Sequence, residues 1–280
     1  MQPQLNKRNK SLLSALIFIF AAISISNSFA SRNGVDQANN SFAVGFTFKT
    51  STGASDLCSG ALISPTYILT AAHCVTDTSG NLYSDYFFTA PRIRLDAPFE
   101  AAKLAKVADV IFPAGYLKAD TTEQSDLAFI KLDRPLATSG FIRIATFEEI
   151  SKLANGSKLH GYGFGAVYET GETYSNLARA YEIDWSNSEL GKLVSFELTS
   201  KDSVGCSGDS GGPITAKLSN SEEVLVAALH GAASVINRCG TAGQDGLYRM
   251  QITLLNSFLP LVSADLQKSF ALPTPAPSVS

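Results

Sequence analysis

The sequence predicts an all-β fold, on the basis of three observations. Short runs of β-branched and aromatic residues recur along the chain, separated by Gly, Pro, Asn and Ser, which is typical of a β-sandwich or a β-barrel. About 250 of the 280 residues remain after an N-terminal leader, enough for one unit with a substantial core. Helical spacing of apolar residues occurs near the C-terminus. Composition alone does not choose between sandwich and barrel.

The first element is predicted to be a secretory signal peptide over residues 1–30. Lys7, Arg8 and Lys10 precede an apolar stretch, and residues 28–30 place small residues where signal peptidase reads them. The apolar stretch is too short to span a membrane; an uncleaved anchor is the alternative. The leader is typical of a bacterial exported protein, so we expect a secreted or periplasmic protein with no membrane attachment after cleavage.

Loss of the leader removes three positive charges and lowers the formal net charge from −3 to −6. An acidic balance argues against nucleic acid or an anionic membrane as a partner. The four cysteines allow three pairings, and oxidised pairs are expected in an exported chain. Four free thiols in a reducing compartment are the alternative. Asp77 and Asp85 are too few and too scattered for a calcium loop, so we expect no metal.

The predicted strands follow in order along the chain, and a helix and a tail close it. Apolar residues at helical spacing predict a C-terminal helix at about 251–266, which Pro260 interrupts. Three prolines and no charge in residues 272–280 predict a disordered tail. The runs that predict strands are residues 42–48, 61–69, 93–95, 127–132, 194–198 and 224–230.

A glycine-rich serine segment carries the strongest indication of chemistry. Residues 205–213 read Gly-Cys-Ser-Gly-Asp-Ser-Gly-Gly-Pro. Glycine loses the most backbone entropy on ordering, so such a run suits a sharp bend or a close approach to another group. A carbonyl oxygen that gains negative charge while Ser210 attacks its carbon would be such a group. Ser210 is therefore a candidate nucleophile.

Two residues upstream supply a candidate base and a candidate orienting acid. His73 follows an apolar β-type run and is surrounded by small residues, and a neutral imidazole can take the proton of a serine hydroxyl. Asp126 opens another strand-like run, where its carboxylate could fix the imidazole tautomer. Taken alone, a structural role for His73 and a turn or cap role for Asp126 are the simpler interpretations. Together with the serine segment, the order His, Asp, Ser favours catalysis.

At these three segments the chain resembles the trypsin/chymotrypsin family of serine endopeptidases. Leu-Thr-Ala-Ala-His-Cys stands at residues 69–74, Asp-Leu-Ala-Phe-Ile-Lys-Leu at 126–132, and Gly-Asp-Ser-Gly-Gly-Pro at 208–213. Weaker similarities lie at residues 58–64, 161–163 and 246–248. The resemblance runs from about residue 33 to residue 261, nearly all of the chain after the leader.

The resemblance implies two six-stranded antiparallel β-barrels within a protease domain at 31–271. The first barrel would run to about 141 and the second over about 142–250, with the active site between them. Ser210 would be the nucleophile, His73 the general acid and base, and Asp126 its orienter. The backbone N–H groups of Gly208 and Ser210 would form the oxyanion hole, and no cofactor is required.

The resemblance also implies two disulfides and a mode of activation. It pairs Cys58 with Cys74 and Cys206 with Cys239. The family matures by a cut that frees an apolar N-terminus, whose amine pairs with the aspartate before the serine, here Asp209. No such cleavage motif occurs in this chain. We expect signal peptidase to expose Ser31 at this position instead.

The specificity pocket departs from the family pattern. Counting back from Ser210 places Val204 at the pocket base, while Gly231 and Gly246 match wall positions that leave the pocket open. An apolar base cannot compensate a substrate cation, so large apolar side chains are slightly favoured before the cut bond. Asp202 could restore a preference for Arg or Lys if two residues bulge. His230, in place of a tryptophan beside the pocket, could serve acidic substrates or be a polar filler.

The sequence thus predicts a serine endopeptidase that acts on proteins or peptides, with a monomer expected. A catalytically inactive, protease-like binding protein is one alternative, although degenerate members usually lose a triad residue and all three motifs are intact here. An esterase-type acyl hydrolase is another, since the same groups would support it.

Overall fold

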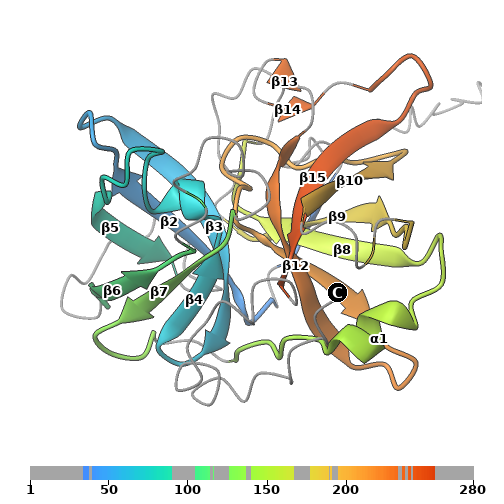
Figure 1. Cartoon of the computed structure of the whole chain (residues 1–280), viewed down its shortest axis with the longest axis horizontal. Coiled ribbons are helices and arrows are strands. Elements are labelled where there is room, and N and C mark those ends of the chain that lie inside the picture. Colours follow the sequence, from blue (N-terminus) through green and yellow to red (C-terminus); the bar gives the residue numbers. More distant parts are fainter. Residues whose placement is uncertain are drawn as a thin grey trace, which may run out of the picture.

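A computed structural model describes most of the chain as two β-sheet halves that lie side by side (Figure 1). The predicted leader, Ser31 and the C-terminal tail lie outside the described residues. The described ranges are 34–37, 40–89, 105–113, 116, 126–136, 140–166, 177–188, 190, 195–232, 235–236, 239–240 and 242–255.

The first half is a six-stranded antiparallel sheet in the order β5-β2-β3-β4-β7-β6. A short 3-10 helix, η1 (Ala72–Cys74), follows β4. The sheet curls strongly, so that β5 and β6 approach one another (Figure 1). Its strands are β2 (Ala43–Lys49), β3 (Ser55–Ser64), β4 (Tyr67–Thr70), β5 (Ser84–Thr89), β6 (Val107–Ile111) and β7 (Ala128–Leu132).

The second half closes on itself. Its strand order is β1-β9-β10-β15-β12-β11-β8, and a further β8–β9 pairing joins the ends into a six-stranded barrel with β1 outside it. Helix α1 (Phe147–Ser151) precedes the barrel, and β13 (Val235–Ile236) pairs with β14 (Cys239–Gly240). The other strands are β1 (Val35–Asp36), β8 (Lys158–Gly163), β9 (Arg179–Asp184), β10 (Ser195–Ser200), β11 (Pro213–Lys217), β12 (Glu223–Ala232) and β15 (Tyr248–Leu254).

The all-β, double-barrel prediction is confirmed, and most predicted strands are present. The run 61–69 is not one strand: it spans the end of β3, a turn and β4. The run 93–95 lies outside the described residues. The helix predicted from residue 251 is wrong up to Leu254, because this segment is strand β15 and pairs with β10 on one side and β12 on the other. Two-sided pairing outweighs helical spacing here; the remainder, 256–266, lies outside the described residues.

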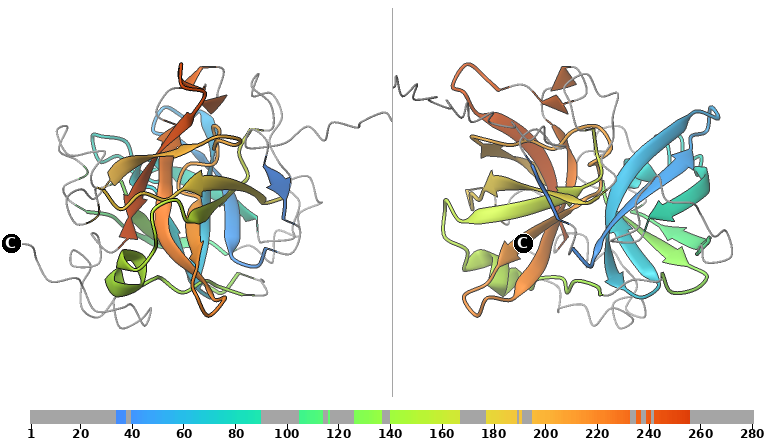
Figure 2. Two further views of the ribbon diagram at one scale, coloured as in Figure 1. Left: turned by 90° about the vertical axis from the view of Figure 1, so that its right-hand side faces the viewer. Right: turned by 180° about the vertical axis from the view of Figure 1, so that it is seen from behind.

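Three apolar clusters hold the fold together. One fills the first half and includes Phe46, Ile68 and Ile130. A second fills the closed barrel and includes Trp185. The third joins the two halves, where Phe42 packs edge to face against Tyr162 at a ring distance of 5.4 Å. The two halves meet where β2 and β3 lie against β8 and where β3 lies against β11, and Figure 2 shows them from the side and from behind. Apolar packing therefore fixes the relation between them.

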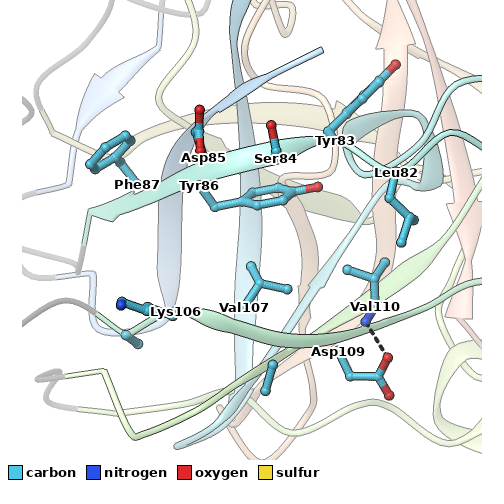
Figure 3. Close-up of a pocket in the computed structure, with 12 residues that line it drawn as sticks. Leu82, Tyr83, Ser84, Asp85, Tyr86, Phe87, Lys106, Val107, Asp109 and Val110 are labelled. Carbon is cyan, nitrogen blue, oxygen red and sulfur yellow. Dashed lines mark hydrogen bonds between the residues drawn. The ribbon is translucent and has the colours of Figure 1, made fainter. Parts of the chain in front are cut away.

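The first half has a seam between its edge strands. Among the described residues no pairing joins β5 to β6, and a hollow of about 780 Å³ lies between them. Figure 3 shows Tyr86 over Val107 and Val110 in this hollow, with Phe87 pointing outward.

No helix in the described part of the chain is long and apolar enough to cross a membrane.

Candidate active site

The β4–β7 pair brings His73 and Asp126 together. In this antiparallel pair Thr70, the last residue of β4, lies opposite Ala128, the first residue of β7. The chain that leaves β4 and the chain that enters β7 are therefore at the same end of the sheet. η1 follows at once and carries His73, and Asp126 stands two residues before β7. Thus two residues 53 positions apart become neighbours.

Asp126 holds His73 at two points. Its Oδ1 accepts a hydrogen bond from the His73 backbone N–H at 2.9 Å, and its Oδ2 lies 2.8 Å from the ring Nδ1. The carboxylate is completely buried, whereas the His73 side chain is 33% exposed. This arrangement places the proton on Nδ1 and leaves Nε2 free as a base.

His73 and Asp126 each shift the pKa of the other. Burial would lower the pKa of His73, but the charge and hydrogen bond of Asp126 outweigh it and raise that pKa above its ordinary value. Burial would raise the pKa of the Asp126 carboxyl, yet the charge of His73 and contacts from His73 and His230 hold it far below its ordinary value. Asp126 is therefore a carboxylate at neutral pH.

The second half supplies the serine loop. It leads into β11, and its backbone is pinned to β12 because Gly211 N–H donates to Leu229 O at 2.7 Å. Gly211 has a φ of +77°, and any Cβ there would overlap Thr70 of the first half. Only glycine combines this conformation with this close approach. The glycines of the segment thus let the loop reach the His73 end of the first sheet.

Ser210 lies beside the two histidines but does not hydrogen-bond to His73. Its Oγ donates to the backbone oxygen of His230 at 3.3 Å. Catalytic hydrogen bonds of serine hydrolases are often long or misaligned without substrate. The N–H groups of Gly208 and Ser210 have no acceptor within the described ranges. Two amides are thus available to an oxygen anion beside Ser210.

His230 contacts Asp126. Its Nδ1 lies 2.5 Å from Asp126 Oδ2, and its ring meets the His73 ring edge to face at 5.4 Å. Its place beside the specificity pocket stays a prediction. Strand β12 is irregular between Leu229 and Gly231, and counting residues in the sequence cannot detect such an irregularity.

Ser59 is a site residue that the sequence did not reveal. It lies on β3, fully buried, and its Oγ donates to Gly208 O at 2.8 Å and accepts from Phe164 N–H at 2.9 Å. Its backbone N–H donates to Ser210 O at 2.8 Å. The residue therefore ties the first half directly to the serine loop. Its only signal was its place within the family-like segment 58–64.

Asp209 is buried beneath the serine loop. Its Oδ1 accepts from Gly165 N–H and its Oδ2 from Cys206 N–H, each at 2.7 Å. A Cβ on Gly163 would overlap this carboxylate, which explains why a glycine stands there. Ser31, the predicted source of a partner amine, lies outside the described residues.

The residues predicted for the specificity pocket lie in different surroundings. Asp202 is exposed, in a hollow with Lys158 and Glu182. Val204 is fully buried in the core of the second barrel. A Cβ at Gly231 or Gly246 would meet no atom within 4 Å. Their part in substrate binding stays a prediction.

Both disulfides are present as predicted, Cys58–Cys74 and Cys206–Cys239. The first fixes η1 to β3 beside His73, and the second fixes the serine loop to β14. Ligand atoms of His73, Asp126 and His230 lie within 4.8 Å of one another. Both imidazole Nδ1 atoms contact the Asp126 carboxylate in this group.

Comparison with known proteins identifies a family and several relatives of this chain. A family profile described as Trypsin matches residues 31–258. Bovine chymotrypsin-C is 28% identical over 58% of this chain and 63% of its own length. Trypsin zeta of Drosophila erecta is 29% identical over 75% of this chain and 74% of its length. Dog chymotrypsin-like elastase family member 1 is 26% identical over 65% and 71%. The chain thus spans less than two thirds of the bovine relative.

Proposed function

Because the chain belongs to the trypsin family, we propose that it is a serine endopeptidase that cuts protein or peptide substrates through Ser210, His73 and Asp126. His73 Nε2 takes the Ser210 proton as Oγ attacks the scissile carbonyl carbon. The oxygen that becomes negative is received by the N–H groups of Gly208 and Ser210. His73 then gives its proton to the leaving amine as the C–N bond breaks, which leaves the acyl group on Ser210 Oγ. Water attacks this acyl group while His73 takes its proton, and His73 returns the proton to Ser210 Oγ as the acid leaves.

This proposal rests on one observation: Asp126 and His73 from the first half lie beside the serine loop of the second half. The carboxylate of Asp126 is buried and holds His73 by both ring and backbone. The serine loop is anchored to the first half by Ser59, and two amides of this loop, those of Gly208 and Ser210, have no acceptor among the described residues. An oxyanion donor is typically worth about 3–4 kcal/mol of barrier, and removal of the nucleophile abolishes nearly all activity in enzymes of this chemistry.

Labelling by a fluorophosphonate probe tests the proposal directly. Mature protein should be labelled at Ser210 and should hydrolyse casein, and Ser210→Ala should abolish both. Ser207→Ala is the matched control, because Ser207 is exposed in the same loop and should keep both. Casein hydrolysis that survives in Ser210→Ala would exclude Ser210 as the nucleophile.

The proposed substrate preference rests on the residue types predicted for the pocket. With Val204 apolar and Asp202 on the outer surface, we propose large apolar side chains before the cut bond. A peptide panel that varies only this residue measures the preference. Cleavage only after Arg and Lys would contradict it.

Export and activation complete the proposal. We propose a monomer, secreted or periplasmic after signal peptidase cleaves before Ser31, whose new amine pairs with Asp209; two disulfides accord with an oxidising compartment. Bacterial origin stays a prediction, since the relatives named above are animal proteins. N-terminal sequencing of active protein should find Ser31, and a start well downstream would contradict this route.

A further inference from the structure

Two histidines share one oxygen of Asp126. His73 Nδ1 lies 2.8 Å from Oδ2, and His230 Nδ1 lies 2.5 Å from the same atom. The first contact is a hydrogen bond; the second is an ion-pair contact, off the line of a straight hydrogen bond. The third histidine of the chain, His160, is on β8, 3.9 Å from Glu182. The arrangement is therefore specific to the site.

The backbone holds His230 in this place. Leu229, one residue earlier, exchanges two hydrogen bonds with the serine loop, to Gly211 and to Gly212. The backbone oxygen of His230 itself accepts from Ser210 Oγ. The His230 side chain is 26% exposed and the carboxylate is completely buried. The ring is thus fixed over Asp126 and still open to protons from solvent.

We propose, on the basis of the triad proposed above, that His230 is a positioning residue that divides the Asp126 carboxylate between two imidazoles and so weakens its hold on His73. One carboxylate carries a single negative charge, and a polar contact made to one imidazole reduces what the other receives. An imidazole changes its charge near neutral pH. The state of His230 therefore sets how readily His73 is protonated.

The expected consequence is a coupled titration. The first proton taken up by the pair is stabilised by Asp126, and the second must enter beside a positive charge about 5 Å away. Such sites titrate in steps that belong to the pair and not to one residue. Among the described residues, the charge of Asp56 also acts on His73, and the charge of Asp126 acts on the hydroxyl of Tyr116. Asp56 and Tyr116 remain in every variant used below.

The pH dependence of kcat/KM tests the proposal through two variants. His230→Asn keeps an amide N–H near the place of Nδ1 but cannot take a charge, and His230→Ala removes the donor as well. Because neither variant can place a second positive charge beside Asp126, the acid limb should move to higher pH by about 0.5–1 unit in His230→Asn, and by at least as much in His230→Ala. His160→Asn should leave the profile unchanged. An unshifted acid limb in both variants, with wild-type protein active, would overturn the proposal.

Imidazole NMR provides a measurement that does not depend on activity. The chain has three histidines, so all three titrations can be followed in Ser210→Ala protein. The ring signal of His73 should follow two coupled steps. A single, uncoupled step for His73 would overturn the proposal even if the position 230 variants fail to fold. Failure of wild-type labelling at Ser210 would instead remove the proposed function and leave this coupling to be judged by NMR.

Discussion

The two halves of the molecule hold their site residues by different means. In the first half, His73 and Asp126 come from one strand pair and are fixed by contacts within that half, the carboxylate bonding to both backbone and ring. In the second half, Ser210 stands on a loop that is held both by Ser59 of the first half, 149 residues from Gly208, and by Leu229 of its own half. The proposed base is therefore positioned by its own sheet, whereas the proposed nucleophile depends in part on the contact between the halves.

The largest effect should come from the internal anchor of the first half. In Asp126→Asn the amide cannot hold His73 in the productive tautomer, so kcat should fall by on the order of 10⁴ while the fold persists. Steady-state kinetics at pH 8 with parallel thermal unfolding measures both. Asp133→Asn, which changes an exposed aspartate bonded to Lys106 N–H and Arg134, is the control. A loss smaller than tenfold in Asp126→Asn would remove the orienting role.

The two disulfides allow the halves to be compared in stability. Cys58–Cys74 closes 16 residues and Cys206–Cys239 closes 33. Loop entropy predicts a loss of about 3 kcal/mol for Cys58→Ala/Cys74→Ala and slightly more, about 4 kcal/mol, for Cys206→Ala/Cys239→Ala. Urea unfolding of the purified double variants measures this. The reverse order would mean that local packing, and not loop length, decides how each half is stabilised.

Ser59→Ala tests the contact between halves. The change leaves Gly208 O and Phe164 N–H without their buried side-chain partner, at a cost of about 2 kcal/mol. Because this serine holds the oxyanion loop, kcat should fall with little change in KM. Ser64→Ala, on the same strand but away from the loop, should be neutral in kcat. Equal kinetics for the two variants would contradict positioning of the loop by Ser59.

The smallest effect is expected in the segment that joins the halves. Arg143 forms an ion pair with Glu149 at 2.9 Å and another with Glu222, the residue before β12, at 3.0 Å. Its hydrogen bonds to Glu149 lower the pKa of that carboxyl from 4.5 to about 2. The folded state therefore gains stability above about pH 4.5, and loses it as pH falls toward 2. In Glu149→Gln this part of the pH dependence should vanish, with a loss below about 1 kcal/mol at pH 7. Urea unfolding from pH 2 to 7 measures it, and an unchanged pH dependence would assign it to other carboxyls.

Motifs in the sequence predicted which residues form the candidate site better than they predicted how strand pairing brings those residues together. The fold class, both disulfides and the neighbourhood of His73 and Asp126 followed from residue types and their resemblance to a family. The contact of His230 with Asp126 did not, because it depends on an irregularity of β12 that shifts the register by one residue. The identity of β15 was also missed, since its apolar residues fit both helical and strand spacing and only pairing on two sides decides between them.

The role of Ser59 has a consequence for the working molecule. Its side chain and backbone reach across the boundary to the loop that carries Ser210, and Gly211 leaves no gap against Thr70. Any motion that parts the two halves would thus also displace the proposed nucleophile. An agent that wedges this boundary apart would therefore lower kcat.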